Sequence, residues 1–196
     1  MTVFITRCCK KPDLAAALAA LCLVFCMAFD TSAAQSSGIE IRSASFTSGE
    51  EGHILNADLD IALTPVLEDA LNKGVPLYFV LEFEVMRSRW YWFNEKITGT
   101  QQQIRLSYNT LTRQYRAGTG ALYQNFSSLP EALNFLSKIR RRLEVEPGAF
   151  KRDGSYSAVL RMRLDITQLP KPFQVNALGS RDWNLASDWY RWTITP

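Results

Sequence analysis

The sequence predicts a mainly β, α+β fold, either an antiparallel β-sandwich or a strongly curved sheet, with about seven strands and two short helices. Two stretches carry this prediction, residues 55–63 and 156–166, in which apolar residues alternate with polar ones. Such strands have one apolar face, as in antiparallel sheets with a solvated side. A nucleotide-binding α/β fold would need strands that are apolar on both faces, so we do not expect one.

The first expected elements are a hairpin and a short helix. Residues 39–47 form a weaker strand than residues 55–63, and the stretch 48–52, Ser-Gly-Glu-Glu-Gly, is typical of a hairpin loop between them. Thr64 then caps a helix that has Pro65 in its first position. These signals predict that the chain passes from the hairpin directly into the helix.

A long central strand is expected over residues 77–93, either continuous or as two strands joined by a bulge. Its alternation stops in the second half, where large or charged residues occupy both faces. Residues 102–109 continue the meander, and residues 113–117 are expected to pair with them. The middle of the chain therefore predicts consecutive antiparallel strands.

The clearest helical signal runs from Leu129 to about Leu143. Ser128 is its expected N-cap, Glu131 completes a capping box, and apolar residues recur at helical spacing. The run Arg140–Arg142 then falls in the last turn, where positive charge favours the helix dipole. Binding of an anionic lipid or phosphate by this run is the less favoured alternative.

The C-terminal part is expected to be largely extended. After the strand over residues 156–166, residues 169–173 contain two prolines and predict an extended connector. Residues 189–194 are rich in aromatic side chains and predict a final strand.

Residues 1–34 have the three parts of a cleavable signal peptide. A basic start is followed by the apolar run 14–29 and then by small residues up to Ala34. The run is shorter than the roughly 20 residues that a membrane span needs, and an uncleaved anchor is the alternative. We therefore expect cleavage after Ala34, a periplasmic location, and a single β-rich domain over residues 35–196.

Composition excludes several function classes. All 4 cysteines lie within the expected leader, so the exported form has no thiol chemistry, disulfide or cysteine–zinc site. The net charge of +3 is too small to imply a polyanion partner, and we expect no nucleic-acid binding. No motif indicates a cofactor, so none is expected.

Four carboxylates on expected strands suggest either catalysis or structural pairing. They are Asp58, Asp60, Glu82 and Glu84. A pair of carboxylates could hydrolyse glycosides. All four fall on outward positions, however, and Arg105, Arg161 and Arg163 occupy outward positions of other strands. Cross-strand ion pairs are therefore the favoured interpretation.

The single histidine, His53, lies in the expected hairpin loop. A catalytic triad would need a serine and an acid that converge on it, and no nucleophile motif is present. One histidine and no cysteine beyond the leader also make a transition-metal site improbable. We therefore expect neither a catalytic residue nor a metal ligand here.

The aromatic segments carry the strongest functional signal. All 5 tryptophans lie in two segments, residues 90–93 and 183–192, where they alternate with arginine and other polar residues. Consecutive residues of a strand point to opposite faces, so core packing accounts for the aromatic residues on one face only. Those on the other face suit a protein interface, a sugar surface or a lipid headgroup zone. We expect the two segments to form one aromatic cluster. The candidate partner or ligand surface consists of Arg89, Trp90, Trp92, Trp183, Trp189, Arg191 and Trp192.

Several blocks of the sequence resemble landmarks of a known family. These blocks are Arg-Trp-Tyr-Trp-Phe (89–93), Ile-Arg-Leu-Ser-Tyr-Asn-Thr-Leu-Thr-Arg-Gln-Tyr-Arg (104–116), Leu-Pro-Lys-Pro-Phe-Gln-Val (169–175) and Trp-Asn-Leu-Ala-Ser-Asp-Trp (183–189). The chain resembles an uncharacterised family of exported bacterial proteins, classed as a domain of unknown function and often encoded beside a nitrogen-regulation-type sensor kinase and response regulator. The resemblance implies a periplasmic accessory role in envelope sensing.

Three function classes follow from these observations. The leading hypothesis is a non-enzymatic binding or accessory module of the cell envelope, with an envelope or membrane sensor protein as its partner. The alternatives are a hydrolase of envelope glycans that uses carboxylates beside exposed tryptophans, and a structural protein that touches the membrane surface through arginine and tryptophan. Membrane association is expected only through an uncleaved anchor or a weak surface contact.

Overall fold

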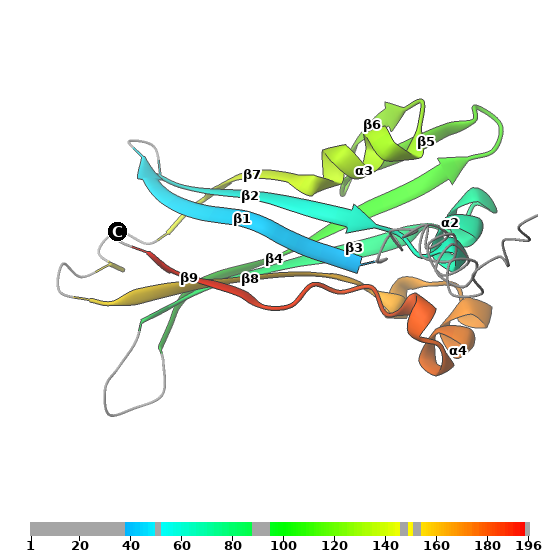
Figure 1. Ribbon diagram of the computed structural model, residues 1–196. Helices are drawn as coiled ribbons and strands as arrows, with labels where there is room; N and C mark the ends of the chain where they lie inside the picture. Colours follow the sequence, from blue (N-terminus) through cyan, green and yellow to red (C-terminus); the bar gives the residue numbers. More distant parts are fainter. Residues whose placement is uncertain (1–37, 50–51, 88–94, 146–148, 151–153, 195–196) are drawn as a thin grey trace, which may run out of the picture. The chain divides into compact units, whose positions relative to one another are not determined.

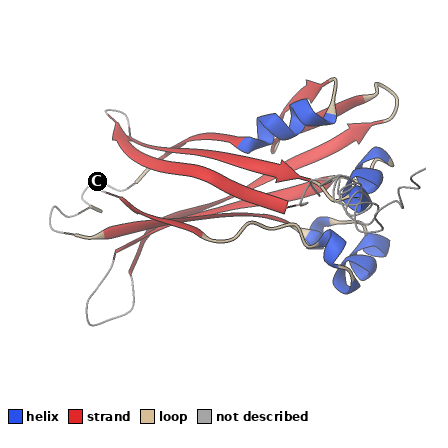
Figure 2. Cartoon of the chain, in the orientation of Figure 1, coloured by secondary structure: helices blue, strands red, loops and turns tan. Residues whose placement is uncertain are grey.

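The computed structural model describes residues 38–49, 52–87, 95–145, 149–150 and 154–194, which form two antiparallel sheets (Figures 1 and 2). The larger sheet has six strands, in the order β6 (Leu122–Phe126), β5 (Gln114–Thr119), β4 (Glu95–Asn109), β3 (Leu77–Arg87), β8 (Tyr156–Leu164) and β9 (Tyr190–Ile194). The smaller sheet has three, in the order β1 (Gly38–Gly49), β2 (Gly52–Ala62) and β7 (Lys138–Leu143).

The core lies between the two sheets. The alternate apolar residues of β2, β3 and β8 turn inward, and Leu55, Phe83 and Leu160 are completely buried among them. Contacts of β1 with β8 and β9 close one side of the core, whereas α3 (Leu129–Ser137) packs on β2, β5 and β6. The strands expected over residues 55–63, 77–93 and 156–166 are thus present as β2, β3 and β8, with the inward faces that their period-two pattern predicts. Residues 88–93 of the second lie outside the described residues.

Two further helices lie at the end of the larger sheet where β3 begins and β8 ends (Figure 1). Helix α2 (Pro65–Asn72) begins as predicted: the Thr64 hydroxyl accepts a hydrogen bond from the Leu67 amide, and Pro65 starts the first turn. Helix α4 (Lys171–Gly179) lies between two short 3-10 helices, η1 (Ile166–Gln168) and η2 (Arg181–Trp183).

The six-stranded sheet has a second face, which we call the outer face because it is turned away from the core. Its residues follow from the strand register and from alternation with buried neighbours. For example, Arg105 lies between the buried Ile104 and Leu106, and it pairs with Tyr78 of β3 and Gly118 of β5. Arg161 and Arg163 alternate with buried residues of β8 in the same way. The outer face therefore carries Arg105, Arg161 and Arg163, whereas the run Arg140–Arg142 lies on β7 of the smaller sheet.

The predicted fold class, a mainly β α+β fold with sandwich-like sheets, is confirmed, but three local predictions are wrong. The expected helix over residues 129–143 ends at Ser137, and residues 138–143 form β7 instead. Arg140 and Arg141 consequently lie on a strand and not at a helix end. β7 forms because it completes the small sheet: Ile139 pairs with Ala57 and Leu143 with His53, and both apolar side chains become buried.

The expected proline connector over residues 169–173 is largely the start of a helix. Pro172 lies in the first turn of α4, where its missing amide hydrogen costs nothing. His53 also differs from its prediction, since it lies in β2 and not in a loop, with its ring stacked 5.1 Å from that of Phe46. The strand count of the described residues is nine rather than about seven.

Candidate functional site

Three arginines of the outer face lie over aromatic rings. The guanidinium of Arg161 is 5.3 Å from the ring centroid of Trp189, that of Arg116 is 5.4 Å from Tyr123, and that of Arg105 is 5.8 Å from Tyr78. These distances lie within the range of cation–π attraction, which fixes the arginines on the sheet surface. Because the pairs occur on strands from one side of the sheet to the other, arginines on aromatic rings recur across the outer face, which also carries Glu82 and Glu84 of β3.

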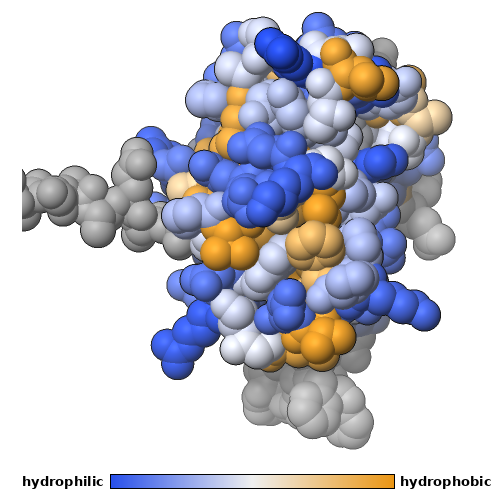
Figure 3. Space-filling model, turned by 90° about the vertical axis from the view of Figure 1, so that its right-hand side faces the viewer, coloured by the Kyte–Doolittle hydropathy of each residue, from blue (hydrophilic) through white to orange (hydrophobic). Residues whose placement is uncertain are grey.

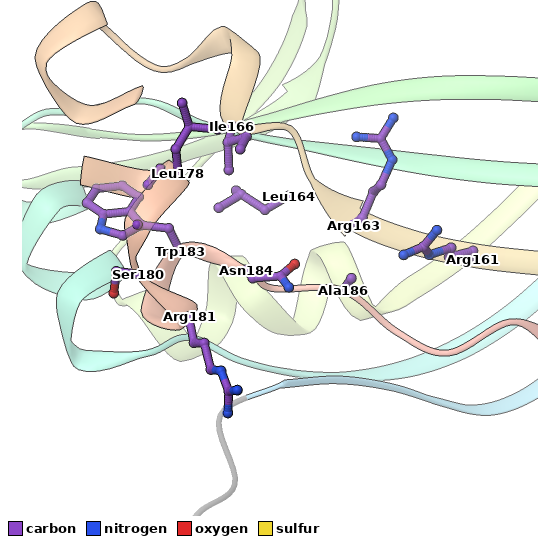
Figure 4. Close-up of a pocket in the computed structure, with 12 residues that line it drawn as sticks. Arg161, Arg163, Leu164, Ile166, Leu178, Ser180, Arg181, Trp183, Asn184 and Ala186 are labelled. Carbon is purple, nitrogen blue, oxygen red and sulfur yellow. The ribbon is translucent and has the colours of Figure 1, made fainter. Parts of the chain in front are cut away.

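A hollow of about 470 Å³ lies beside the predicted Trp183, and we call it the arginine–tryptophan hollow (Figure 4). The aliphatic side chains of Ile166 and Leu178 lie near Trp183 at one end, and Arg161 and Arg163 of β8 lie at the other. Arg181 of η2 adds a third positive charge to the lining. The hollow is therefore apolar at one end and basic at the other, a combination that suits small-molecule sites.

The strands and turns that hold this hollow are fixed by backbone pairing. The segment before β9 runs along β8: the Leu164 amide donates to the Leu185 carbonyl at 2.7 Å, and the Ser187 amide donates to the Met162 carbonyl at 2.8 Å. The Ser187 hydroxyl also accepts from the Met162 amide at 3.0 Å. These bonds place η2 and its Trp183 beside the arginines of β8.

The three arginines differ in their ion pairing, and Glu82 of β3 lies opposite Arg161 in the strand register. Arg163 donates to Glu82 at 3.0 Å, so its charge is compensated. Arg161 and Arg181 form no ion pair with any residue that the structure describes, and no acidic side chain is among the described residues that line the hollow. The Arg161 Nε is shielded from solvent and has no hydrogen-bond partner in the described part of the chain. The donors that the hollow can offer to an anion are therefore the terminal guanidinium nitrogens of Arg161 and Arg181, and not the shielded Nε.

The predicted surface residues have different environments. Trp183 is buried against Phe173 with ring centroids 5.7 Å apart, whereas Trp189 is 49% exposed. On β9, Arg191 is exposed and Trp192 is half-buried, with its ring centroid 6.1 Å from that of Phe83. Among the described members of the predicted surface, only Trp183 lines the arginine–tryptophan hollow, whereas Trp189 contacts its Arg161.

The other part of the predicted surface, Arg89, Trp90 and Trp92, lies outside the described residues. The expected contact between the two aromatic segments therefore stays a prediction. Arg161, Arg163 and Arg181 contribute to the hollow, but they were not among the predicted site residues. The outward positions of Arg161 and Arg163 in the sequence were the available signal for two of them.

The four outward carboxylates are all paired with cations. Arg140 donates to Asp58 at 2.8 Å, Arg42 pairs with Asp60, Arg163 with Glu82, and Lys96 with Glu84 at 2.5 Å. Cross-strand pairing was predicted with arginines such as Arg163, which does bind Glu82. The cations that bind the other three carboxylates come instead from β1, β4 and β7. The hydrogen bond from Arg140 holds the pKa of the Asp58 carboxyl below its ordinary value, opposed by partial burial.

Metal-binding clusters and membrane-spanning helices are both absent from the described residues. No group of three or more His, Cys, Asp or Glu side chains among them is arranged to hold a metal ion. None of the helices in these residues combines the length and apolarity that a membrane span requires.

Exposed apolar side chains occur near the end that carries α2 and α4. They include Val66 of α2, Leu111 of the β4–β5 turn, and Val175 and Leu178 of α4. In the view from this end, hydrophobic patches are separated by hydrophilic side chains (Figure 3). Scattered apolar residues of this kind are ordinary on protein surfaces, so this end is a weaker candidate site than the hollow.

The fold and the site define a class: a two-sheet antiparallel domain with a basic and aromatic sheet face. A family model described as "Domain of unknown function (DUF4390)" matches residues 36–193, and the chain belongs to this family. The predicted resemblance to an uncharacterised family is thereby confirmed, whereas the gene neighbourhood stays an expectation. No curated protein and no solved structure matches the chain.

Proposed function

We propose that the protein is a non-enzymatic, exported binding or accessory module of the cell envelope, and that the arginine–tryptophan hollow is its ligand surface. The observation that carries this proposal is the state of Arg161. Its guanidinium rests on the half-exposed ring of Trp189, while its shielded Nε has no partner among the described residues. The terminal nitrogens of this fixed guanidinium form no ion pair with a described residue, so they are the donors that can bind a carboxylate or phosphate.

The proposed ligand is an anion with an apolar part. Ile166, Leu178 and Trp183 provide the apolar end of the hollow, and Arg161 and Arg181 provide the charged end. The volume of about 470 Å³ falls in the range of small-molecule sites, roughly 300–1,000 Å³. The finer proposal, a periplasmic module that serves a membrane sensor, is supported by the leader pattern and by the family resemblance.

The carboxylate environments favour binding over glycan hydrolysis. A glycosidase needs one carboxyl group that stays protonated near neutral pH and a second carboxylate close to the same bond. Each of the four outward carboxylates is instead held by a cation, and the pKa of Asp58 is shifted downward, away from that of a general acid. These pairs support a structural role for the carboxylates.

A retention assay on washed envelope fractions tests the proposal. We expect Arg161→Gln combined with Trp189→Ala to weaken retention about tenfold or more, because a charged hydrogen bond is worth about 1.5–3 kcal/mol. The matched control is Arg42→Gln, which removes one charge from the other sheet. Equal losses in both variants, or no loss in either, would contradict the proposal. Release of soluble glycan fragments by the wild type would favour the hydrolase.

A further inference from the structure

A second hollow opens on the outer face beside the β5–β6 hairpin, and we call it the hairpin hollow. Its volume is about 300 Å³. The residues that line it are Arg105, Ser107, Arg116, Gly118, Gly120 and Tyr123. None of them lines the arginine–tryptophan hollow, so the two sites have separate residues.

The strand register explains why these side chains meet. Arg105 of β4 pairs with Gly118 of β5, and Gly118 pairs with Tyr123 of β6. Two residues further along β4, Ser107 pairs with Arg116 of β5. Residues that pair in this way point to the same side of a sheet, so both arginines, the serine hydroxyl and the tyrosine ring share the outer face.

Gly118 gives the hollow its wall. A Cβ atom at this position would overlap the backbone of Leu122 and Tyr123. The backbone of β6 therefore lies close over Gly118, and only a residue without a side chain permits this approach. The same approach brings Tyr123 across from Arg116, whose guanidinium lies 5.4 Å from the ring centroid.

The arginines of the hairpin hollow differ in their partners from several other arginines of the domain. Arg87, Arg140 and Arg163 each bind a carboxylate. Arg105 and Arg116 form no ion pair with any described residue, and aromatic rings hold them instead. The Arg116 Nε is shielded from solvent and has no hydrogen-bond partner in the described part of the chain.

We propose that the hairpin hollow is an oxyanion site that binds a phosphate group, with Arg105, Arg116 and the Ser107 hydroxyl as its donors. Two guanidinium groups match the planar, bidentate geometry that phosphate oxygens favour. No acidic side chain is among the described lining residues, so nothing there repels an anion. The volume of about 300 Å³ is roughly ten times that of one liquid water, which leaves room for a phosphate and the group esterified to it.

This inference does not depend on the proposed function, because the two hollows have separate residues. Both open on the same face, with the strand β3 between β4 and β8. Two strand spacings, about 10 Å, therefore separate β4 from β8. Phosphate binding by the hairpin hollow would give the outer face a second anion-binding site beside the arginine–tryptophan hollow.

Titration with inorganic phosphate, followed by amide NMR spectra, tests the site. We expect saturable shifts at residues 105–107 and 116–120, and we expect Arg105→Gln and Arg116→Gln each to weaken binding about tenfold or more. Arg105 is exposed, so its variant should fold, and the urea midpoint checks both variants. Lys171→Gln removes the same charge from exposed α4 and should leave binding unchanged.

A second arm separates the two sources of a phosphate group. A soluble short-chain phosphatidic acid is titrated against the same variants, with a short-chain phosphatidylcholine as the zwitterionic control. Tighter binding of phosphatidic acid than of inorganic phosphate, lost in Arg116→Gln, would assign a lipid headgroup; the reverse order would assign a free phosphate. Shifts that spread over all basic residues without saturation, or that persist in both arginine variants, would overturn the site.

Discussion

The ion pair between Arg140 and Asp58 illustrates how single residues set the chemistry of the small sheet. The Arg140 guanidinium donates to Asp58 at 2.8 Å, and the Ser43 hydroxyl donates to the same carboxylate at 3.4 Å. The hydrogen bond from Arg140 is the main cause of the lowered pKa of Asp58. Since Asp58 is paired with Arg140 only in the folded state, ionisation of its carboxyl group is more favourable in the folded than in the unfolded chain.

We therefore expect Arg140→Gln to raise the pKa of Asp58 toward its ordinary value of 3.8, as measured by a carboxyl-carbon NMR titration. A lowered folded-state pKa stabilises the fold above the unfolded-state pKa, and this contribution disappears as the pH falls through the folded-state pKa. The difference in stability between wild type and variant should accordingly shrink in acid. Arg42→Gln serves as the control, because Arg42 pairs with Asp60. An unchanged Asp58 titration in Arg140→Gln would contradict the assignment.

Gly118 is the residue on which the shape of the β5–β6 hairpin most depends. We expect Gly118→Ala to lower the free energy of unfolding by about 1–3 kcal/mol, because the added Cβ would overlap the backbone of β6. Gly120→Asn is the matched control: its φ of 59° suits asparagine, and a Cβ atom there would meet nothing within 4 Å. Urea unfolding followed by circular dichroism gives both values. Equal midpoints for wild type and Gly118→Ala would show that β6 is not held against β5.

At the scale of elements, a strand can be predicted from the sequence when one of its faces is buried in the core. The strands β2, β3 and β8 each bury one face in the core, so their alternation is visible in the sequence. The strand β6, Leu-Tyr-Gln-Asn-Phe, is exposed along most of its length and has no such alternation. It forms because β5 offers it a partner, which no local pattern reports.

The helix-to-strand switch at residue 138 has the same origin. Ile139 and Leu143 are spaced so that they fit the apolar stripe of a helix, and they also fit one face of a strand. Pairing of β7 with β2 decides between the two, and this contact joins residues that are far apart in the sequence. The hollow of Figure 4 was equally hidden, because its arginines come from β8 and η2 and meet only in the fold.

The C-terminal segment is expected to be essential for the fold. Trp183, Leu185 and Ile194 are buried, and a buried side chain of this size contributes about 1.5–3 kcal/mol. Deletion of residues 183–196 should therefore remove a large part of a total stability of about 5–15 kcal/mol. We expect the truncated chain to show no cooperative urea transition, whereas Trp189→Ala, which changes an exposed side chain, should retain one near the wild-type midpoint. A truncated chain with an unchanged midpoint would show that the segment is a dispensable tail.

At the scale of the whole molecule, the leader pattern of residues 1–34 predicts that the domain is exported. Residues 1–34 lie outside the described residues, so cleavage after Ala34 stays a prediction. Intact-mass measurement of the exported protein should show a chain that begins at Gln35. A mass that includes residues 1–34 would indicate a retained anchor.

The two sheets also divide the surface of the domain into faces of different character. On the six-stranded sheet, Arg87 and Arg163 pair with carboxylates, but Arg105, Arg116 and Arg161 rest on aromatic rings beside two hollows. On the three-stranded sheet, Arg42 and Arg140 are neutralised by Asp60 and Asp58. This asymmetry supports the proposal that ligand binding belongs to the outer face of the larger sheet.

Site-specific photo-crosslinking in the intact envelope tests this central claim most directly. A photoreactive residue replaces Asn184, which lines the arginine–tryptophan hollow, and in a second variant it replaces Ser45, which is exposed on β1. We expect a discrete crosslinked product from position 184 that disappears when Arg161→Gln is added, and no product from position 45. Products of equal yield from both positions, or a product at 184 that persists with Arg161→Gln, would contradict the assignment of the binding face.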